Sequence, residues 1–263
     1  MDDAASTRRL LGTRGIHNFR DYGGYATPHG RLRAGLLYRS AQHLGATADD
    51  LALVAGLRLA AVIDLRGGSE REAAPCPRPE GFAARIYAVS EKTDGLLGPH
   101  IEAARNLEGG FDACWLMREG YAAMPYRWRL RNVFANYFEA LATTDGPTLV
   151  HCAAGKDRTG LACALLHMAL GVHRDDVIAD YLLTNSSGDA EARVSDGMAE
   201  IRRIFGEELD MDQVRLLMLV QPDYLEAALG AIEARHGGVS AYLADHLGVG
   251  PGRIEAIASR VIP

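Results

Sequence analysis

Hydrophobic positions in the first two thirds of the chain alternate between short continuous runs and helical spacing. Continuous apolar runs, typical of buried strands, cover residues 36–40, 59–65, 82–89 and 147–150. Between them, residues 47–57 and 128–141 place apolar side chains three or four positions apart, and a short helix is expected from Glu70 to just before Pro75. Strands separated by helices predict an α/β fold with a central, mostly parallel sheet flanked by helices.

The last third of the chain predicts helices only. Residues 161–170 are apolar on almost every side, which indicates a buried central helix closed by Gly171. Further helices are predicted over residues 174–186, 190–205, 211–220, 223–236, 239–247 and 252–261. Because no internal repeat or linker divides the sequence, we expect one domain over residues 1–263, with an all-helical C-terminal part over residues 174–263.

Composition narrows the expected partners. The 263 residues carry a net charge of −6, so neither nucleic acid nor an anionic membrane is an expected partner. The N-terminus lacks the apolar core of a signal peptide, and no apolar run approaches the roughly 18 residues of a transmembrane segment. The four cysteines lack paired metal-ligand spacing, and one free thiolate would leave three, so a cytoplasmic location is expected.

One stretch, residues 150–160 (VHCAAGKDRTG), joins the last strand-like run to the apolar helix. Backbone N–H groups in such a turn, together with the positive end of the helix dipole, form an anion site. The planar guanidinium of Arg158 can hold two oxygens of a phosphate there. The same potential favours the thiolate form of Cys152. The stretch therefore predicts a phosphatase whose thiolate attacks phosphorus and forms a cysteinyl-phosphate.

The pattern His-Cys-x5-Arg-Thr-Gly in this stretch resembles the phosphate loop of the cysteine-based protein tyrosine phosphatase superfamily. Its inner residues, Ala-Ala-Gly-Lys-Asp-Arg, are similar to the atypical bacterial branch of tyrosine and lipid phosphatases found in mycobacteria and Listeria. Residues 18–24, 63–66 and 180–185 also resemble that branch. The resemblance implies hydrolysis of phosphotyrosine, with phosphoserine, phosphothreonine or phosphoinositides as further substrates and inorganic phosphate or vanadate as ligands. Members are sometimes exported without a classical signal.

The expected site residues lie in or beside this loop. Cys152 is the nucleophile, and Arg158 binds the phosphate and its transition state. Thr159 places a hydroxyl near the sulfur, whereas His151 supports the loop from behind and helps to keep the thiolate. The backbone N–H groups that line the site belong to Ala153, Ala154, Gly155, Lys156, Asp157 and Arg158. Because these groups supply the positive field, no metal or cofactor is expected.

The general acid has three candidates. A carboxylic acid must protonate the leaving oxygen and later activate water, and the sequence contains no Trp-Pro-Asp segment. Asp157, inside the loop, is the first candidate, with an N-cap role as its alternative. Asp64, at the end of a buried strand, is the second, with pairing to Arg66 as its alternative. The third is an acid brought in by a flap over residues 91–128.

Three further features leave alternatives open. Residues 91–128 combine glycines with aromatic residues and predict the least regular part of the fold, either a lid, as the resemblance implies, or a surface connection. Residues 15–25 predict a structural turn with an internal Arg20–Asp21 pair, with a catalytic role as the less favoured alternative. Lys156 either binds the additional phosphates of phosphoinositides or is a solvated lysine.

Two other classes of function compete with the phosphatase prediction. The first is a phosphate-binding module without turnover, against which the presence of both Cys152 and Arg158 argues. The second is a sulfurtransferase of the rhodanese type, because those enzymes also place a cysteine in a strand–loop–helix cradle. Their loops carry different residues after the cysteine, so this function ranks last.

Overall fold

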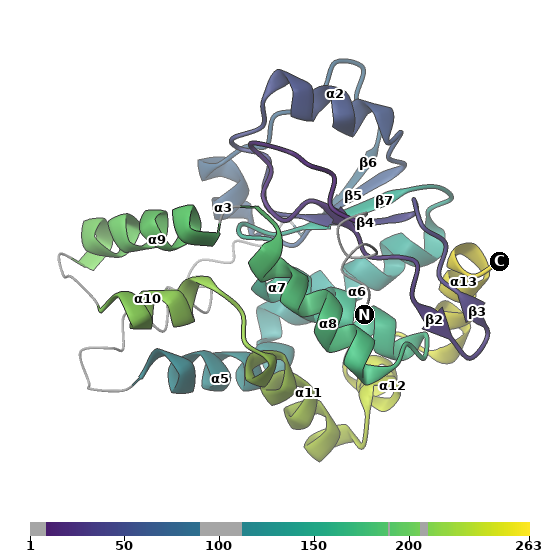
Figure 1. The fold of residues 1–263 in the computed structure, drawn as a ribbon. Coiled ribbons are helices and arrows are strands. Elements are labelled where there is room, and N and C mark those ends of the chain that lie inside the picture. Colours follow the sequence, from purple (N-terminus) through teal and green to yellow (C-terminus); the bar gives the residue numbers. More distant parts are fainter. Residues whose placement is uncertain (1–8, 90–111, 189, 206–209) are drawn as a thin grey trace.

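The computed structural model describes residues 9–89, 112–188, 190–205 and 210–263 (Figure 1). Five strands form the central sheet in the order β1-β4-β7-β5-β6, in which β4, β7, β5 and β6 are parallel and β1 is antiparallel to β4. The strands of this sheet are β1 (Arg20–Asp21), β4 (Leu37–Ser40), β5 (Ala61–Asp64), β6 (Arg85–Ala88) and β7 (Thr148–His151). A separate hairpin pairs β2 (Ala26–Thr27) with β3 (Gly30–Arg31). The predicted α/β class with a mostly parallel sheet is thus confirmed.

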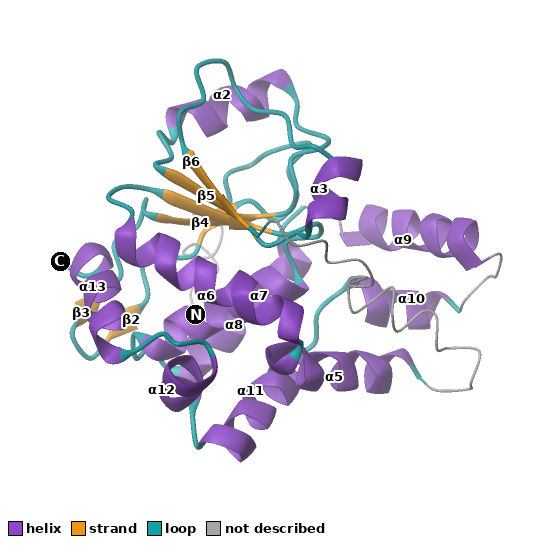
Figure 2. Cartoon of the chain, turned by 180° about the vertical axis from the view of Figure 1, so that it is seen from behind, coloured by secondary structure: helices purple, strands orange, loops and turns teal. Residues whose placement is uncertain are grey.

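Helices cover both faces of this sheet (Figure 2). In chain order they are α2 (Ala48–Gly56), α3 (Gly68–Ala73), α5 (Ala113–Ala123), α6 (Trp128–Thr143), α7 (Asp157–Ala169), α8 (Arg174–Ser186), α9 (Ala190–Phe205), α10 (Met211–Met218), α11 (Pro222–His236), α12 (Val239–Ala241) and α13 (Pro251–Val261). A 3₁₀ turn, η2 (Met124–Tyr126), precedes α6, and a π-helical turn, η3 (Tyr242–His246), follows α12. The helices predicted after residue 174 are therefore present.

The two faces of the sheet pack into different clusters. Val62 and Leu149 join a small apolar cluster with Val54 of α2. Their chain neighbours Ile63 and Val150 belong to the large core formed with the helices on the other face. Because successive side chains of a strand point to opposite faces, strands covered on both sides need continuous apolar runs, which is the pattern that the sequence shows.

The parallel register aligns the carboxyl ends of the three central strands. Ser40, Asp64 and His151 are aligned across β4, β5 and β7, so all three lie at the same carboxyl edge of the sheet. The middle strand, β7, leads into α7 at this edge. Ligand sites of open parallel sheets form at such edges.

The predicted irregularity of residues 91–128 is wrong for residues 113–126, which form α5 and η2. Asp112 caps α5 by accepting a hydrogen bond from the Trp115 N–H at 2.7 Å. The helix packs against α11 and α10, and α9 lies beside α10, so α5, α10 and α9 form a stack at one side of the molecule (Figure 1). Residues 90–111 lie outside the described residues, and a lid over residues 91–128 remains a prediction.

The described residues add two general features. All four cysteines, at positions 76, 114, 152 and 163, are free thiols. Among the helices that the structure describes, none combines the length and apolarity needed to cross a membrane.

Candidate active site

The phosphate loop, residues 152–158, runs from the end of β7 into the first turn of α7. The side chain of Cys152 is buried at the start of the loop. Gly155 has a φ of +63°, and a Cβ atom there would lie 2.4 Å from both the Ala41 N and the Ser40 O atoms. Only glycine fits this position, because a side chain would meet fixed backbone as well as an unfavourable φ. The loop thus turns tightly enough for its N–H groups and the α7 N-terminus to converge.

A buried network holds the loop from behind. The Gly155 carbonyl oxygen accepts hydrogen bonds from Asn18 Nδ2 at 2.7 Å and Arg39 Nη2 at 3.2 Å. Asp180 of α8 accepts from Arg39 Nη1 at 2.9 Å and from Arg20 Nη2 at 3.4 Å. Burial alone would raise the pKa of Asp180, but the charges of Arg20 and Arg39 outweigh it and lower the pKa to about 2. Asp180 is therefore ionised at neutral pH and balances the two guanidinium groups.

The predicted Arg20–Asp21 pair is wrong. Arg20 points into the network and donates to Asn18 and Asp180. Asp21 instead accepts from the Gly23 and Gly35 backbone N–H groups and fastens the turn alone. The two side chains diverge because neighbouring residues of a strand point to opposite faces of the sheet.

Arg158 is held in one orientation by Glu70 of α3. Both terminal nitrogens of the guanidinium lie 2.7 Å from the two carboxylate oxygens of Glu70, and Nη1 also donates to the Leu65 carbonyl at 3.3 Å. Of the five donors of a guanidinium, these contacts leave Nε–H and one Nη2–H, which share one edge. That edge can bind two oxygens of a phosphate while Glu70 holds the other edge.

Asp157 is the first residue of α7 and is buried. Its Oδ1 atom accepts a hydrogen bond from the Tyr121 hydroxyl at 2.8 Å, and Tyr121 in turn accepts from the Tyr181 hydroxyl at 2.7 Å. The N-cap position belongs to Lys156 rather than to Asp157. A tyrosine pair from α5 and α8 therefore fixes the rotamer of the carboxylate at the head of α7.

Lys156 is not the solvated lysine that one alternative expected. The residue is 4% exposed, and its Nζ donates to the Leu217 carbonyl of α10 and lies 3.5 Å from Asp157 Oδ1. Burial lowers the pKa of this ammonium, which the neighbouring Asp157 carboxylate partly offsets. The side chain therefore ties the phosphate loop to α10.

Asp64 is bound by Arg66, as one alternative anticipated. Arg66 Nε and Nη2 lie 3.0 Å and 2.7 Å from its two oxygens. Although burial alone would raise the pKa of Asp64, the His151 ring, 3.6 Å away, and Arg66 lower it. Such a carboxylate remains ionised and is a poor proton donor.

His151 immediately precedes Cys152 at the end of β7, and Thr159 lies in the first turn of α7. Burial lowers the pKa of His151 to about 4, against an opposing effect of Asp64, so the ring is neutral at neutral pH. The role expected for His151, support of the loop from behind, therefore remains a prediction for a neutral ring. The Thr159 hydroxyl is buried and has no hydrogen-bond partner among the residues that the structure describes.

The structure brings the loop residues together as predicted but also adds residues that the sequence did not mark. Cys152, Asp157, Lys156, Arg158 and Thr159 share one turn, whereas Asp64 lies behind it with His151. The residues missed are Glu70, Arg39, Asp180 and Tyr121. A capping box at Gly67 and Glu70, and a charged residue inside a buried strand at Arg39, were the available signals.

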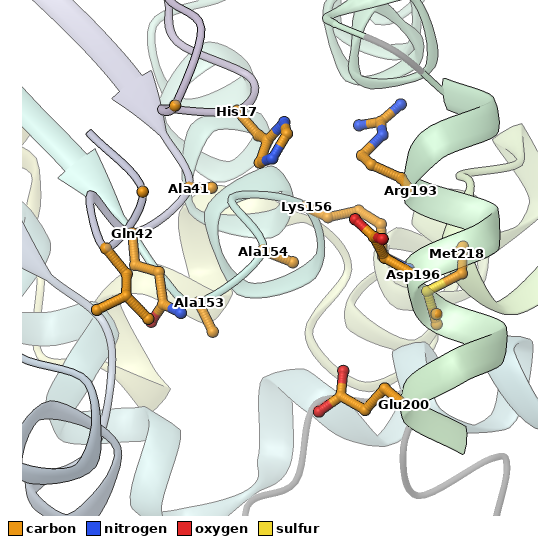
Figure 3. A pocket seen from close by; sticks show the side chains of 14 residues that line it. His17, Ala41, Gln42, Ala153, Ala154, Lys156, Arg193, Asp196, Glu200 and Met218 are labelled. Carbon is orange, nitrogen blue, oxygen red and sulfur yellow. The ribbon is translucent and has the colours of Figure 1, made fainter. Parts of the chain in front are cut away.

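A cavity of about 300 Å³ adjoins the outer rim of the phosphate loop (Figure 3). Ala153, Ala154 and Lys156 of the loop line one part of it. The other walls come from the segments around His17 and Gln42, from α9 and from Met218. No group of three or more His, Cys, Asp or Glu side chains in the described part of the chain is arranged to hold a metal ion.

The parallel sheet with an anion-binding loop at its edge is an arrangement of the phosphatase type. A model of the tyrosine phosphatase family matches residues 11–262, so the chain belongs to that family. A protein of Cupriavidus necator named as a tyrosine-protein phosphatase is 37% identical over 239 residues, covering 89% of this chain and 82% of the relative. The triple specificity protein phosphatase PtpB of Mycobacterium tuberculosis is 31% identical over 261 residues, covering 88% and 91%.

A solved structure, that of P. aeruginosa TpbA, matches 74% of this chain and 96% of its own at 20% identity with a TM-score of 0.32, a likeness too distant to carry an argument. The family match and the two relatives support an enzyme of the protein tyrosine or dual-specificity phosphatase class.

Proposed function

We propose that this chain hydrolyses phosphomonoesters through a cysteinyl-phosphate on Cys152. The observation that carries the proposal is the position of Arg158 in the same turn as the thiol, with one guanidinium edge held by Glu70 and the other left for phosphate. The backbone N–H groups of the loop and the α7 N-terminus can bind the phosphate oxygens. Each feature supports nucleophilic attack on a bound phosphate.

The first step transfers the phosphoryl group to sulfur. The Cys152 thiolate attacks phosphorus, the bond from phosphorus to the leaving oxygen breaks, and an acid gives that oxygen a proton. In the second step water attacks phosphorus, the sulfur–phosphorus bond breaks, and the same residue takes up the proton of the water. Inorganic phosphate leaves the loop, where vanadate is the corresponding inhibitor. Arg158 stabilises the charge on the equatorial oxygens in both steps.

Asp157 is the better of the two described candidates for the acid. It lies beside Arg158 at the head of α7, and the Tyr121 hydroxyl, which donates to Oδ1 at 2.8 Å, orients its carboxyl group there. Asp64 is bound on both oxygens by Arg66, which disfavours proton donation. The Thr159 hydroxyl has no hydrogen-bond partner among the described residues, and we expect it to turn toward the sulfur as that atom leaves in the second step. We therefore expect Asp157→Asn to lower kcat by about 10²–10⁴-fold, and least for nitrophenol as leaving group.

Phosphotyrosine is the proposed substrate, with phosphoserine, phosphothreonine and phosphoinositides as further candidates. The family description and the names of the two relatives support phosphorylated proteins, and the name of the mycobacterial relative supports a broad range. To bind the additional phosphates of a phosphoinositide, Lys156 would first have to break its hydrogen bond to the Leu217 carbonyl. This contact argues against its phosphoinositide role.

The decisive experiment measures hydrolysis of p-nitrophenyl phosphate with and without vanadate. We expect vanadate-sensitive turnover that is lost in Cys152→Ser, together with trapping of phosphate on the wild-type protein after rapid acid quench. Phosphate binding without turnover would instead identify a binding module, and thiosulfate:cyanide activity would identify a sulfurtransferase. Either result would overturn the proposal.

A further inference from the structure

The cavity beside the phosphate loop can accommodate a part of the substrate that lies next to the bound phosphate. Ala153 and Ala154 belong both to the loop and to the cavity wall, so the two spaces meet at these residues. Because in-line attack places the leaving oxygen opposite the Cys152 sulfur, the organic group of a substrate must point out of the loop, from where a flanking residue can reach this rim. The cavity, about 300 Å³ in volume, is large enough for one long amino-acid side chain.

Two walls of this cavity are formed by closely packed segments, one around Gly15 and Gly45 and the other between Gly197 and Met218. Gly15 lies so near Gly45 that a Cβ atom on it would be 1.7 Å from the Gly45 carbonyl oxygen. Asp50 also holds this segment, because it accepts a hydrogen bond from the Gly15 N–H at 2.8 Å. On the opposite side, a Cβ atom on Gly197 of α9 would lie 2.3 Å from the Met218 sulfur. At this point α9 packs closely against the Met218 side chain of α10.

The charges that line the cavity are not equivalent. Lys156 donates to the Leu217 carbonyl and lies 3.5 Å from Asp157, so a carboxylate balances its charge. Arg193 donates to the uncharged Asn185 carbonyl at 3.4 Å and brings a positive charge to its end of the cavity. Asp196 and Glu200 stand one turn apart on α9 and extend their carboxylates toward the loop side of the cavity, whereas Arg193 extends toward His17 (Figure 3).

Neither carboxylate is strongly neutralised by its neighbours. Glu200 has an ion pair with Arg203 at 3.9 Å, but both side chains are more than half exposed, and such surface pairs contribute little. Asp196 is exposed on the same face of α9. The part of the α9 wall formed by Asp196 and Glu200 therefore presents negative charge to a ligand, away from Arg193. A positive group is attracted to this part of the wall, and a second phosphate is repelled from it.

We propose that this cavity is a substrate subsite for the side chain of a lysine or arginine that flanks the phosphorylated residue of a protein, with Asp196 and Glu200 as the specificity-determining residues. The inference rests on the proposed function, because the phosphate must lie in the loop for its flanking residue to reach the cavity. Such a subsite would favour a phosphoprotein over a polyphosphoinositide, because the additional phosphates of the lipid would be repelled by the same two carboxylates.

The test compares two phosphotyrosine peptides that differ only in the flanking residues, arginine in one and glutamate in the other. For each enzyme variant, kcat/KM on the peptides is divided by kcat/KM on p-nitrophenyl phosphate, which lacks flanking residues. We expect the wild type to prefer the basic peptide by about 10-fold, and the double variant Asp196→Asn/Glu200→Gln to prefer it by less than about 3-fold, as expected for two exposed carboxylates. Asp175→Asn, an exposed acid on α8, is the matched control and should keep the wild-type preference.

A short-chain polyphosphoinositide completes the panel. We expect its hydrolysis, on the same scale, to rise in the double variant because two repelling charges are gone. Equal peptide preference in wild type and double variant, or faster lipid than peptide hydrolysis that falls in the double variant, would overturn the subsite. Loss of p-nitrophenyl phosphate turnover in Cys152→Ser tests the proposed function separately, so the two failures can be told apart.

Discussion

The Tyr181–Tyr121–Asp157 chain of hydrogen bonds allows a sharp test of how the acid is positioned. Tyr121→Phe removes one hydroxyl that donates to Asp157 at 2.8 Å and accepts from Tyr181 at 2.7 Å, and all three side chains are buried. A hydrogen bond to a charged acceptor contributes about 1.5–3 kcal/mol, and an orphaned buried hydroxyl costs about 1–3 kcal/mol. We therefore expect the free energy of unfolding to fall by about 2–4 kcal/mol.

The kcat of Tyr121→Phe on different substrates distinguishes a role in positioning Asp157 from a role in stability alone. Without the Tyr121 hydroxyl, Asp157 loses one of the contacts that set its rotamer, and the proposed acid would be less well positioned. We expect kcat on an alkyl or phenyl phosphate to fall by about 10-fold or more, within the range that general acid catalysis supplies, and kcat on p-nitrophenyl phosphate to fall much less. Steady-state kinetics on a series of aryl phosphates, below the melting temperature of each variant, measures this dependence on the leaving group.

Tyr137→Phe provides the matched control. It breaks another buried tyrosine pair, in which the Tyr22 and Tyr137 hydroxyls are 3.0 Å apart, without touching Asp157. We expect a loss of about 1 kcal/mol in stability and an unchanged dependence on the leaving group. If Tyr121→Phe also left that dependence unchanged while Asp157→Asn steepened it, the tyrosines would be structural only. If Asp157→Asn had no such effect, the acid itself would have to be sought elsewhere.

Three further predictions follow from buried charges. Glu70→Gln should lower kcat/KM on p-nitrophenyl phosphate by about 10–100-fold, because the guanidinium that Glu70 holds loses its ionic anchor; a loss below 3-fold would contradict this role. Asp180→Asn should destabilise the protein by about 3–5 kcal/mol in urea unfolding, since it leaves two buried arginines without a counter-charge, whereas Asp145→Asn at an exposed pair should cost less than about 1 kcal/mol. Burial lowers the pKa of His43 to about 3 and that of His151 to about 4, so below pH 6.5 the unfolded chain binds more protons, and stability should fall by about 2–4 kcal/mol between pH 7 and pH 5; a flat profile in urea titrations would refute this.

The local pattern of apolar and capping residues in the sequence was sufficient to predict most of the helices and strands. Strands such as β5 and β7 are covered on both faces, so their apolar runs are continuous and easily recognised. The helix α2 carries its own start signal, a capping box between Thr47 and Asp50. For residues 113–126 the sequence misled, because glycines and aromatic residues suggested a loose segment, whereas packing on α10 and α11 stabilises a helix there.

The active site was predictable only where its residues are contiguous. Cys152 and Arg158 stand in one short motif, and the structure keeps them in one turn. The partners Glu70 and Asp180 lie far away in sequence, and nothing in a single sequence indicates which buried arginine each carboxylate meets. Arg20 illustrates the same limit, because its acidic neighbour in sequence is not its partner in space.

The carbonyl of Gly155 is held by Asn18, near the start of the described chain, and by Arg39, whose own partner Asp180 lies on α8. During synthesis, these contacts cannot all form until the ribosome has completed α8, long after Cys152 itself has been made. A nascent chain would therefore carry Cys152 before the loop around it has its final shape, and we expect activity to arise only in chains that include α8.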